Sequence, residues 1–302
     1  MEGSTPHRPD LGAVVVGVDG SDTALTAAFW AAAEAARRNS ALHIFYAADT
    51  ADGIFYLSPE IIAGVHTEGR DLLELTAAQV SERFPTLHVT TEYSRRDPVS
   101  GLHRVGAKYG TTVVGHRGLG GFESLMLGSV GLRVAAAATT PVIVVRGGAD
   151  LAENGVVLAA VRDECDFESA RRAAREAELR KATLRLLTVW NIVQYAGTVV
   201  TMLDDVNEFA GRHVRGLKSV ADRVHDEFPA LPVNADAEKG VSVASVLVEA
   251  SRHADLLVMG GRRSPGYFGP TLGRTTHSLL HHSHCPVELI PRHDQARGSD
   301  AS

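Results

Sequence analysis

The stretch AVVVGVDGSDTALTAAFWAAAEAARR, residues 13–38, decides the fold class of this chain. Its first residues form a short, valine-rich apolar run, which is typical of a buried β-strand. An alanine-rich helical segment follows, and Ser21 and Asp22 are residue types that favour the start of a helix. The sequence therefore predicts a strand, a turn and a helix, in that order.

The same alternation continues beyond residue 38. Helical patterns at about residues 67–83 and 98–109 separate further short apolar runs. Strands that are apolar throughout and separated by helices indicate a parallel sheet with helices on both faces, which defines an α/β fold. The five strands predicted for this half are AVVVGVD, ALHIFYAAD, TLHVTTEYS, TTVVGH and PVIVVRG.

The second half of the chain repeats this order. Its predicted strands are VVLAAVRD, TLRLLTVWN, LPVNADAEKG, ADLLVMGG and PVELIPR. Three residues recur at one common offset: Gly115 as Gly260, Gly128 as Gly273 and Pro141 as Pro286. Such an internal duplication indicates two homologous domains. We expect a polar tail at 1–10, domain 1 at 11–148, domain 2 at 155–293 and a second polar tail at 294–302.

Composition narrows the function classes. The 302 residues carry a formal charge of −6 with a pI near 6.2, which argues against a nucleic-acid-binding surface. No apolar run approaches the ~18 residues of a membrane span, and the first ten residues lack the apolar core of a signal peptide. Two cysteines, Cys165 and Cys285, are too few for a disulfide scaffold and fit a cytoplasmic protein; we expect both to be buried or partly buried.

A glycine-rich segment follows the fourth predicted strand of domain 1. The sequence VVGHRGLGGFESLMLGSV, residues 113–130, contains Gly115, Gly118 and Gly128. In open parallel sheets, ligands bind beyond the carboxyl ends of the strands, where loop amides and a helix N-terminus favour phosphate. Ser129 adds a hydroxyl, and Asp19, after the first strand, offers acceptors to a ribose or base. These features predict a nucleotide site.

The spacing Gly115-x-x-Gly118, nine residues, then Gly128-Ser129 resembles the G-2x-G-9x-G-(S/T) phosphate loop of ATP-binding universal stress proteins. VVVGVDGS at the start of domain 1, PVIVV at its end and the tandem repeat extend the resemblance to nearly the whole chain. The resemblance implies two doubly wound domains, each with five parallel strands, of the universal stress protein-like and adenine nucleotide alpha hydrolase-like type. It implies ATP, ADP or AMP as ligand, with Mg²⁺ as a further candidate.

The resemblance also implies site residues and pairing. Asp19 and the backbone near Ala47 would hold the adenosine part, and the glycine loop would surround the phosphates. The implied ligand-binding set is Gly17, Asp19, Ala47, Gly115, Gly118, Gly128, Ser129 and Val130. Terminal strands pair in this family, so TPVIVV and CPVELI would pair either with each other inside the chain or with another chain in a homodimer.

Domain 2 departs from the loop pattern. Arg263 stands where domain 1 has Gly118, and Arg274 stands where it has Ser129, whereas Asp163 matches Asp19. A side chain at the first position hinders close approach to the backbone, although arginine can itself bind phosphate. We therefore expect nucleotide binding in domain 1 and a degenerate site in domain 2.

Several features have a simpler interpretation. Asp19 and Ser21 would cap the first helix even without a ligand, and Ser129 would be only an N-cap. His277 and His281 have the spacing of two metal ligands, but no third ligand is evident, and a solvated helical face is the preferred interpretation. The run ESARRAAREAELRK predicts a solvent-facing helix surface with intrahelical ion pairs.

Three functions follow from these observations. The preferred one is a universal stress protein that binds an adenine nucleotide in domain 1 and acts in stress response through occupancy of that site. The chain lacks a P-loop lysine motif and a G-x-G-x-x-G turn, and no residue is evident that would activate water. The alternative is a nucleotide-dependent enzyme, such as a slow ATP hydrolase, whose substrate contacts lid segments at 50–66 or 194–206. A third is a scaffold in which domain 2 serves for pairing.

Overall fold

A computed structural model of the chain describes residues 11–50, 58–118, 128–146, 154–190, 203–261, 264–266 and 269–291. Domain 1 comprises β1 (Ala13–Gly17), α1 (Asp22–Arg38), β2 (Leu42–Ala47), α2 (Pro59–Arg83), β3 (Val89–Ser94), α3 (Pro98–Tyr109), β4 (Gly110–Gly115), α4 (Ser129–Ala136) and β5 (Val142–Val145). Domain 2 comprises β6 (Val156–Ala160), the 3₁₀ turn η2 (Glu164–Asp166), α5 (Phe167–Arg180), β7 (Thr183–Trp190), α6 (Leu203–Glu227), β8 (Val233–Lys239), α7 (Val243–Ala250), the 3₁₀ turn η4 (Ser251–His253), β9 (Leu256–Gly261), β10 (Ser264–Gly266), β11 (Gly269–Thr271), α8 (Arg274–His282) and β12 (Val287–Pro291).

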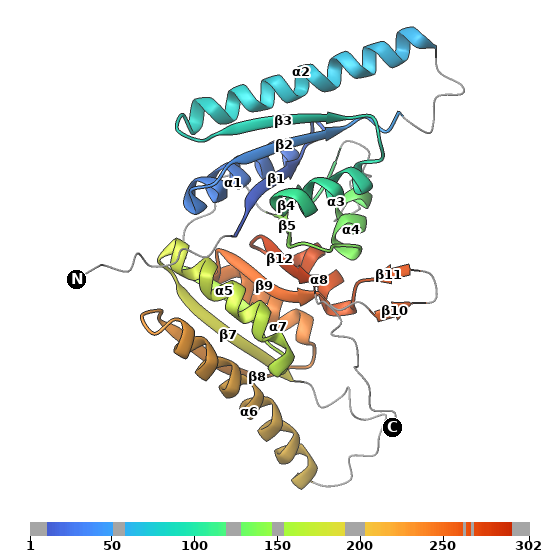
Figure 1. The fold of residues 1–302 in the computed structure, drawn as a ribbon. Helices are drawn as coiled ribbons and strands as arrows, with labels where there is room; N and C mark the ends of the chain where they lie inside the picture. The colour runs from blue at the N-terminus through green and yellow to red at the C-terminus, as the bar shows by residue number, and fades with distance from the viewer. Residues whose placement is uncertain are drawn as a thin grey trace, which may run out of the picture.

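Ten strands form one sheet in the order β3-β2-β1-β4-β5-β12-β9-β6-β7-β8. All pairs within each half are parallel, so the predicted α/β fold with two five-stranded parallel sheets is confirmed. The halves join where β12 pairs with β5 in antiparallel register, with Glu288 opposite Ile143. The two domains therefore join edge to edge in one continuous sheet (Figure 1). Their terminal strands pair inside the chain.

Helix α1 shows why these segments fold as predicted. The side chain of Ser21 accepts a hydrogen bond from the amide of Ala24 at the N-terminus, and Asn39 ends the helix in the left-handed conformation with φ 53°. Between these caps lies a fully buried face made of small side chains: Ala27, Ala28, Ala31, Ala32 and Ala35. Because alanine has a high helix propensity and little volume, this face packs closely on the sheet.

The core has three parts. One cluster lies between the sheet and α1 and α2 in domain 1, and a second lies between the sheet and α5 and α6 in domain 2. The third combines residues of both domains, among them Val144 of β5, Val287 of β12 and Leu280 of α8. The junction between the domains is therefore part of the hydrophobic core.

Helix α2 begins at Pro59, eight residues before the predicted start at residue 67. Proline at the first position and Ser58 at the N-cap fit a helix start, because the fixed φ of proline suits the first turn and its missing N–H would have no intrahelical acceptor there. The second part of the expected lid segment 50–66 is therefore helical. Of the expected lids, residues 51–57 and 194–202 lie outside the described residues, and residues 203–206 form the start of α6.

The prediction of a solvent-facing charged surface on α5 holds for Glu168, which is exposed and pairs with Arg171, but is wrong for Glu176 and Arg180. Glu176 is fully buried, and the side chain of Arg180 is only 7% exposed. Their intrahelical ion pair is present, but Arg180 also lies 2.5 Å from Glu34, and Glu176 lies 2.8 Å from Arg38, both on α1. The charge pattern of one helix did not reveal that another helix, with complementary charges, covers this face.

The two cysteines differ in exposure. Cys285 is buried, and burial raises the pKa of its thiol to about 12. Cys165 is exposed, so the expectation that both thiols are buried or partly buried is wrong for this residue. It lies in the turn η2 on the surface of domain 2, where its side chain has no core to enter.

The helices of the described ranges include none with the length and apolar character that a bilayer crossing requires. The hairpin β10–β11, which the sequence did not predict, lies between β9 and α8 in domain 2 (Figure 1). It belongs to the segment that corresponds to the glycine loop of domain 1.

Candidate functional site

The loop after β1 is held by side chains of its own. Ser21 donates to Oδ1 of Asp19 from its backbone N at 3.0 Å and from its hydroxyl at 2.7 Å. Ser21 also caps α1, so the expected capping role is observed for Ser21. Asp19 contributes by holding the cap residue, with its carboxylate at the carboxyl end of the sheet.

Two glycines of the loop after β4 lie close to the start of domain 1. A Cβ on Gly115 would lie 2.7 Å from the carbonyl oxygen of Thr23, so only glycine lets the end of β4 approach the first turn of α1. A Cβ on Gly118 would collide with Oδ2 of Asp19. Gly115 therefore has a structural reason that is independent of any ligand, because it meets backbone, whereas at Gly118 the contact is with the end of a side chain that can shift.

Gly128 differs from these two. It is the N-cap of α4 with φ −68°, and a Cβ there would make ordinary contacts of 3.6 Å with Arg117 and Gly118. Its amide donates to the carbonyl of His116 at 2.8 Å, which brings the two ends of the loop together. Ser129 is the first helical residue and is exposed, so it is not the N-cap. Residues 119–127 lie outside the described residues.

These elements surround a cavity of about 410 Å³ at the carboxyl ends of β1 and β4. All eight residues of the predicted ligand-binding set line it: Gly17, Asp19, Ala47, Gly115, Gly118, Gly128, Ser129 and Val130. Their role toward a ligand remains a prediction. The structure thus brings together residues that lie up to 113 positions apart in the sequence, from Gly17 to Val130.

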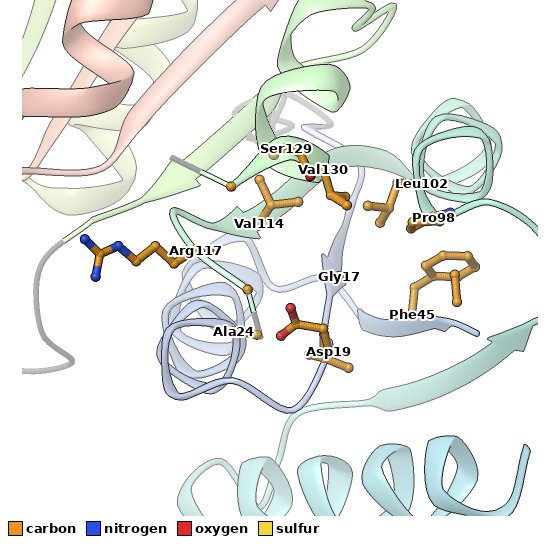
Figure 2. A pocket seen from close by; sticks show the side chains of 16 residues that line it. Gly17, Asp19, Ala24, Phe45, Pro98, Leu102, Val114, Arg117, Ser129 and Val130 are labelled. Atoms are coloured by element: carbon orange, nitrogen blue, oxygen red, sulfur yellow. The ribbon is translucent and has the colours of Figure 1, made fainter. Parts of the chain in front are cut away.

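Further lining residues were not predicted. Phe45, Pro98 and Leu102 gather at one side of the cavity and give it an apolar wall, whereas the side chain of Arg117 extends away on the opposite side (Figure 2). Two sequence patterns could have indicated them. Phe45 lies two residues before Ala47 on β2, so both side chains face the same side of the sheet, and Pro98 and Leu102 are four apart on α3.

A histidine lies at the base of the glycine loop. Burial, together with the charges of Arg146 and Arg117, holds the pKa of His116 below its usual value. Its Nδ1 lies 3.3 Å from the carbonyl oxygen of Val145 on β5. His116 is therefore neutral at physiological pH and adds no charge to the cavity.

The corresponding region of domain 2 is built differently. Asp163 repeats the turn of Asp19, with Oδ1 accepting from the amide of Cys165 at 3.0 Å, but Oδ2 accepts from Nε of Arg162 at 2.9 Å. Gly273 caps α8 as Gly128 caps α4, and Arg274 is the exposed first helical residue. Arg263 lies outside the described residues. In the described part of this region, arginine thus stands at the helix position that Ser129 has in domain 1.

The rings of the histidine pair of α8 lie close together and are tilted by 34°. The ring centroids of His277 and His281 lie 4.3 Å apart, and His281 is partly buried, so the expected solvated face applies only to His277. Burial, followed by the charge of His277, lowers the pKa of His281. Across the described part of the chain, no group of three His, Cys, Asp or Glu residues has the geometry to hold a metal ion.

The fold and the cavity define a tandem α/β protein with a candidate ligand site at the strand ends of its first domain. The sequence pattern of the Universal stress protein family matches residues 12–146 and 154–291. The chain belongs to this family, and the resemblance noted from its sequence is confirmed.

Known relatives agree with this assignment. Universal stress protein Rv2623 of Mycobacterium tuberculosis is 35% identical over 150 residues, which cover 48% of each chain, so this match spans about half the length of that relative. Universal stress protein Rv2624c of the same organism is 26% identical over 290 residues, covering 94% of this chain and 98% of that protein.

A solved structure shows the same fold over most of the chain. A universal stress protein from Archaeoglobus fulgidus superposes with a TM-score of 0.70 at 16% identity and covers 94% of this chain and 97% of its own. A universal stress protein solved in complex with cAMP is 29% identical, with a TM-score of 0.31, and covers 44% of this chain and 94% of its own.

Proposed function

We propose that domain 1 binds one adenine nucleotide, ATP or else ADP or AMP, in the cavity at the ends of β1 and β4. The observation that carries this proposal is the division of the cavity into two chemically different sides. Phe45, Pro98 and Leu102 form an apolar wall, which suits a planar base. Another part of the lining is formed by glycine backbone and the N-terminus of α4, where amides and the helix dipole favour phosphate.

Individual residues fit the parts of such a ligand. The carboxylate of Asp19 accepts hydrogen bonds from ribose hydroxyls, and Ser129 donates its exposed hydroxyl to a phosphate oxygen. The absence of a side chain at Gly128 leaves the helix start accessible. Mg²⁺ would bind mainly through phosphate oxygens and water, because the described residues provide no cluster of metal-binding side chains.

The proposed role is regulatory and rests on occupancy. A ligand that binds only the folded protein stabilises it, and one that binds one conformation more tightly shifts the population toward that conformation. Nucleotide concentration would thereby set the state of the protein during stress. No catalytic residue is part of this proposal.

We propose a different role for domain 2, namely pairing with domain 1 without nucleotide. In domain 2, Arg162 occupies an oxygen of Asp163 that would otherwise face a ligand hydroxyl. The bulky Arg274 replaces the compact hydroxyl of Ser129. The antiparallel pair β5–β12 already gives domain 2 a structural function.

The experiment is calorimetric titration of the full chain with ATP, ADP and AMP, with and without Mg²⁺, using two matched variants. Gly128→Ala and Gly273→Ala both add one methyl group at the N-cap of an equivalent helix, and both glycines have φ compatible with alanine. We expect Gly128→Ala to weaken binding by about tenfold or more, because the methyl group occupies space next to phosphate, at about 1.4 kcal/mol per factor of ten. Gly273→Ala should leave the affinity unchanged.

Three outcomes would contradict the proposal. No heat with any adenylate, on folded protein, would refute nucleotide binding. A loss of affinity with Gly273→Ala but not Gly128→Ala would place the site in domain 2. Rapid multi-turnover formation of ADP by the unmodified chain would favour an enzyme over a regulator that acts through occupancy.

A further inference from the structure

Thr23, in the first turn of α1, reaches across to the glycine loop. Its hydroxyl donates to the carbonyl oxygen of Arg117 at 2.6 Å, although the two residues lie 94 positions apart in the sequence. Arg117 stands between Gly115 and Gly118. A single side chain thus ties the start of the glycine loop to the helix that follows β1.

The orientation of this hydroxyl is determined by its neighbours. Ser21 Oγ lies 2.7 Å from Oδ1 of Asp19 and 3.2 Å from Oγ1 of Thr23. An ionised carboxylate and a backbone carbonyl can only accept, and each hydroxyl has one proton. The two shorter contacts, at the ends of this chain, therefore take both protons, and the proton of Thr23 is directed to Arg117.

Peptide geometry passes this constraint to Gly118. The described backbone contains no cis peptide bond, so the carbonyl of Arg117 and the N–H of Gly118 point in opposite directions in one plane. When Thr23 holds the carbonyl toward α1, the amide of Gly118 must point away from α1. The preceding carbonyl, that of His116, is held by the amide of Gly128 at 2.8 Å. Two consecutive carbonyls at the loop entrance are thereby fixed.

We propose that Thr23 is a positioning residue, which sets the direction of the Gly118 amide so that this amide meets the phosphates of the bound nucleotide. Thr23 itself does not line the cavity. This inference rests on the proposed nucleotide site and adds that phosphate recognition depends on a hydrogen bond made outside it. Binding of the nucleoside part, against the apolar wall and Asp19, does not depend on this bond.

The test compares ATP with adenosine, which lacks phosphate, by calorimetry on the full chain. Thr23→Val removes the hydroxyl and keeps the branched shape, and Thr23→Ser keeps the hydroxyl. Thr26→Val is the matched control, because Thr26 lies one turn further along α1 and its hydroxyl donates to the carbonyl of Asp22 in the same helix, at 2.9 Å. Thermal unfolding of each variant verifies that the fold is intact.

We expect Thr23→Val to weaken ATP binding by about fivefold to twentyfold while adenosine affinity stays within twofold, a range that corresponds to about 1–2 kcal/mol. Thr23→Ser and Thr26→Val should keep the ATP-to-adenosine affinity ratio of the unmodified chain. The proposal is overturned if Thr23→Val leaves this ratio unchanged, whether both affinities persist or both fall together. If the unmodified chain binds neither ligand, the proposed nucleotide site itself is refuted, which is a separate result.

Discussion

At the residue scale, the glycines of domain 1 serve two different purposes. Gly115 is required by the packing of the protein on itself, against the backbone of Thr23. Gly128 has room for a methyl group, so its side of the loop is open toward the cavity. The glycine spacing therefore combines a structural requirement with access for a ligand.

This distinction predicts different stabilities for two alanine variants. Gly115→Ala places a Cβ within 2.7 Å of a backbone oxygen that belongs to a helix and cannot rotate away, and should destabilise the protein by about 1–3 kcal/mol. Gly128→Ala should cost less than about 1 kcal/mol, the usual range for a cap position. Urea denaturation of both variants measures the difference. Equal destabilisation would show that Gly115 is not held by packing.

At the element scale, the sequence predicted most of the fold. Strand and helix periodicities are local, so residues 13–38 were enough to predict β1 and α1, and the tandem repeat predicted the same units in domain 2. Helix α2 was predicted too short, because the segment before residue 67 contains proline and glycine. The structure shows that Pro59 begins the helix. The hairpin β10–β11 has no periodicity to detect, since each strand has three residues.

The candidate site was predicted only in part, because sequence patterns show local features and not which elements pack together. The spacing of the glycines and the position of Asp19 after a strand can be read from the sequence. The apolar wall is not, because Phe45 and Leu102 come from separate elements and resemble ordinary core residues in the sequence. The burial of Glu176 was missed because it depends on α1, which lies in the other domain.

At the scale of the whole molecule, a buried cluster of ion pairs joins the two domains. Glu34 and Arg38 near the end of α1 correspond to Glu176 and Arg180 near the end of α5, and each arginine contacts the glutamates of both helices. Glu288 of β12 adds a third fully buried carboxylate, 2.8 Å from Arg172. Buried ion pairs are costly to break, so this cluster favours the observed pairing of domain 1 with domain 2.

The cluster predicts a pH dependence of stability. Burial, followed by the charge of Glu34, raises the pKa of Glu176 to about 7, whereas Arg180 and Arg38 outweigh burial and lower the pKa of Glu34. Between the ordinary glutamate pKa near 4.5 and about 7, the folded protein holds a proton at Glu176 that the unfolded chain has released. The contribution of Glu176 to stability therefore decreases as the pH rises through this window.

Glu176→Gln removes this titration. We expect the free energy of unfolding of the unmodified chain to fall, relative to that of the variant, by about 1–3 kcal/mol between pH 5 and pH 8. Urea midpoints measured across this range give the difference and cancel the contributions of histidines, which titrate in both proteins. Parallel pH profiles for the two proteins would show that Glu176 keeps its ordinary pKa in the fold.

We propose that, of the two domains of this tandem pair, only the first holds an adenine nucleotide. Native mass spectrometry of the full chain in the presence of ATP tests it most directly, because the mass shift counts bound ligands per chain. We expect a single bound adenylate, and at ATP concentrations near the dissociation constant its occupancy should fall in Gly128→Ala and be retained in Gly273→Ala. A chain that carries two adenylates, or none at saturating ATP, would contradict it.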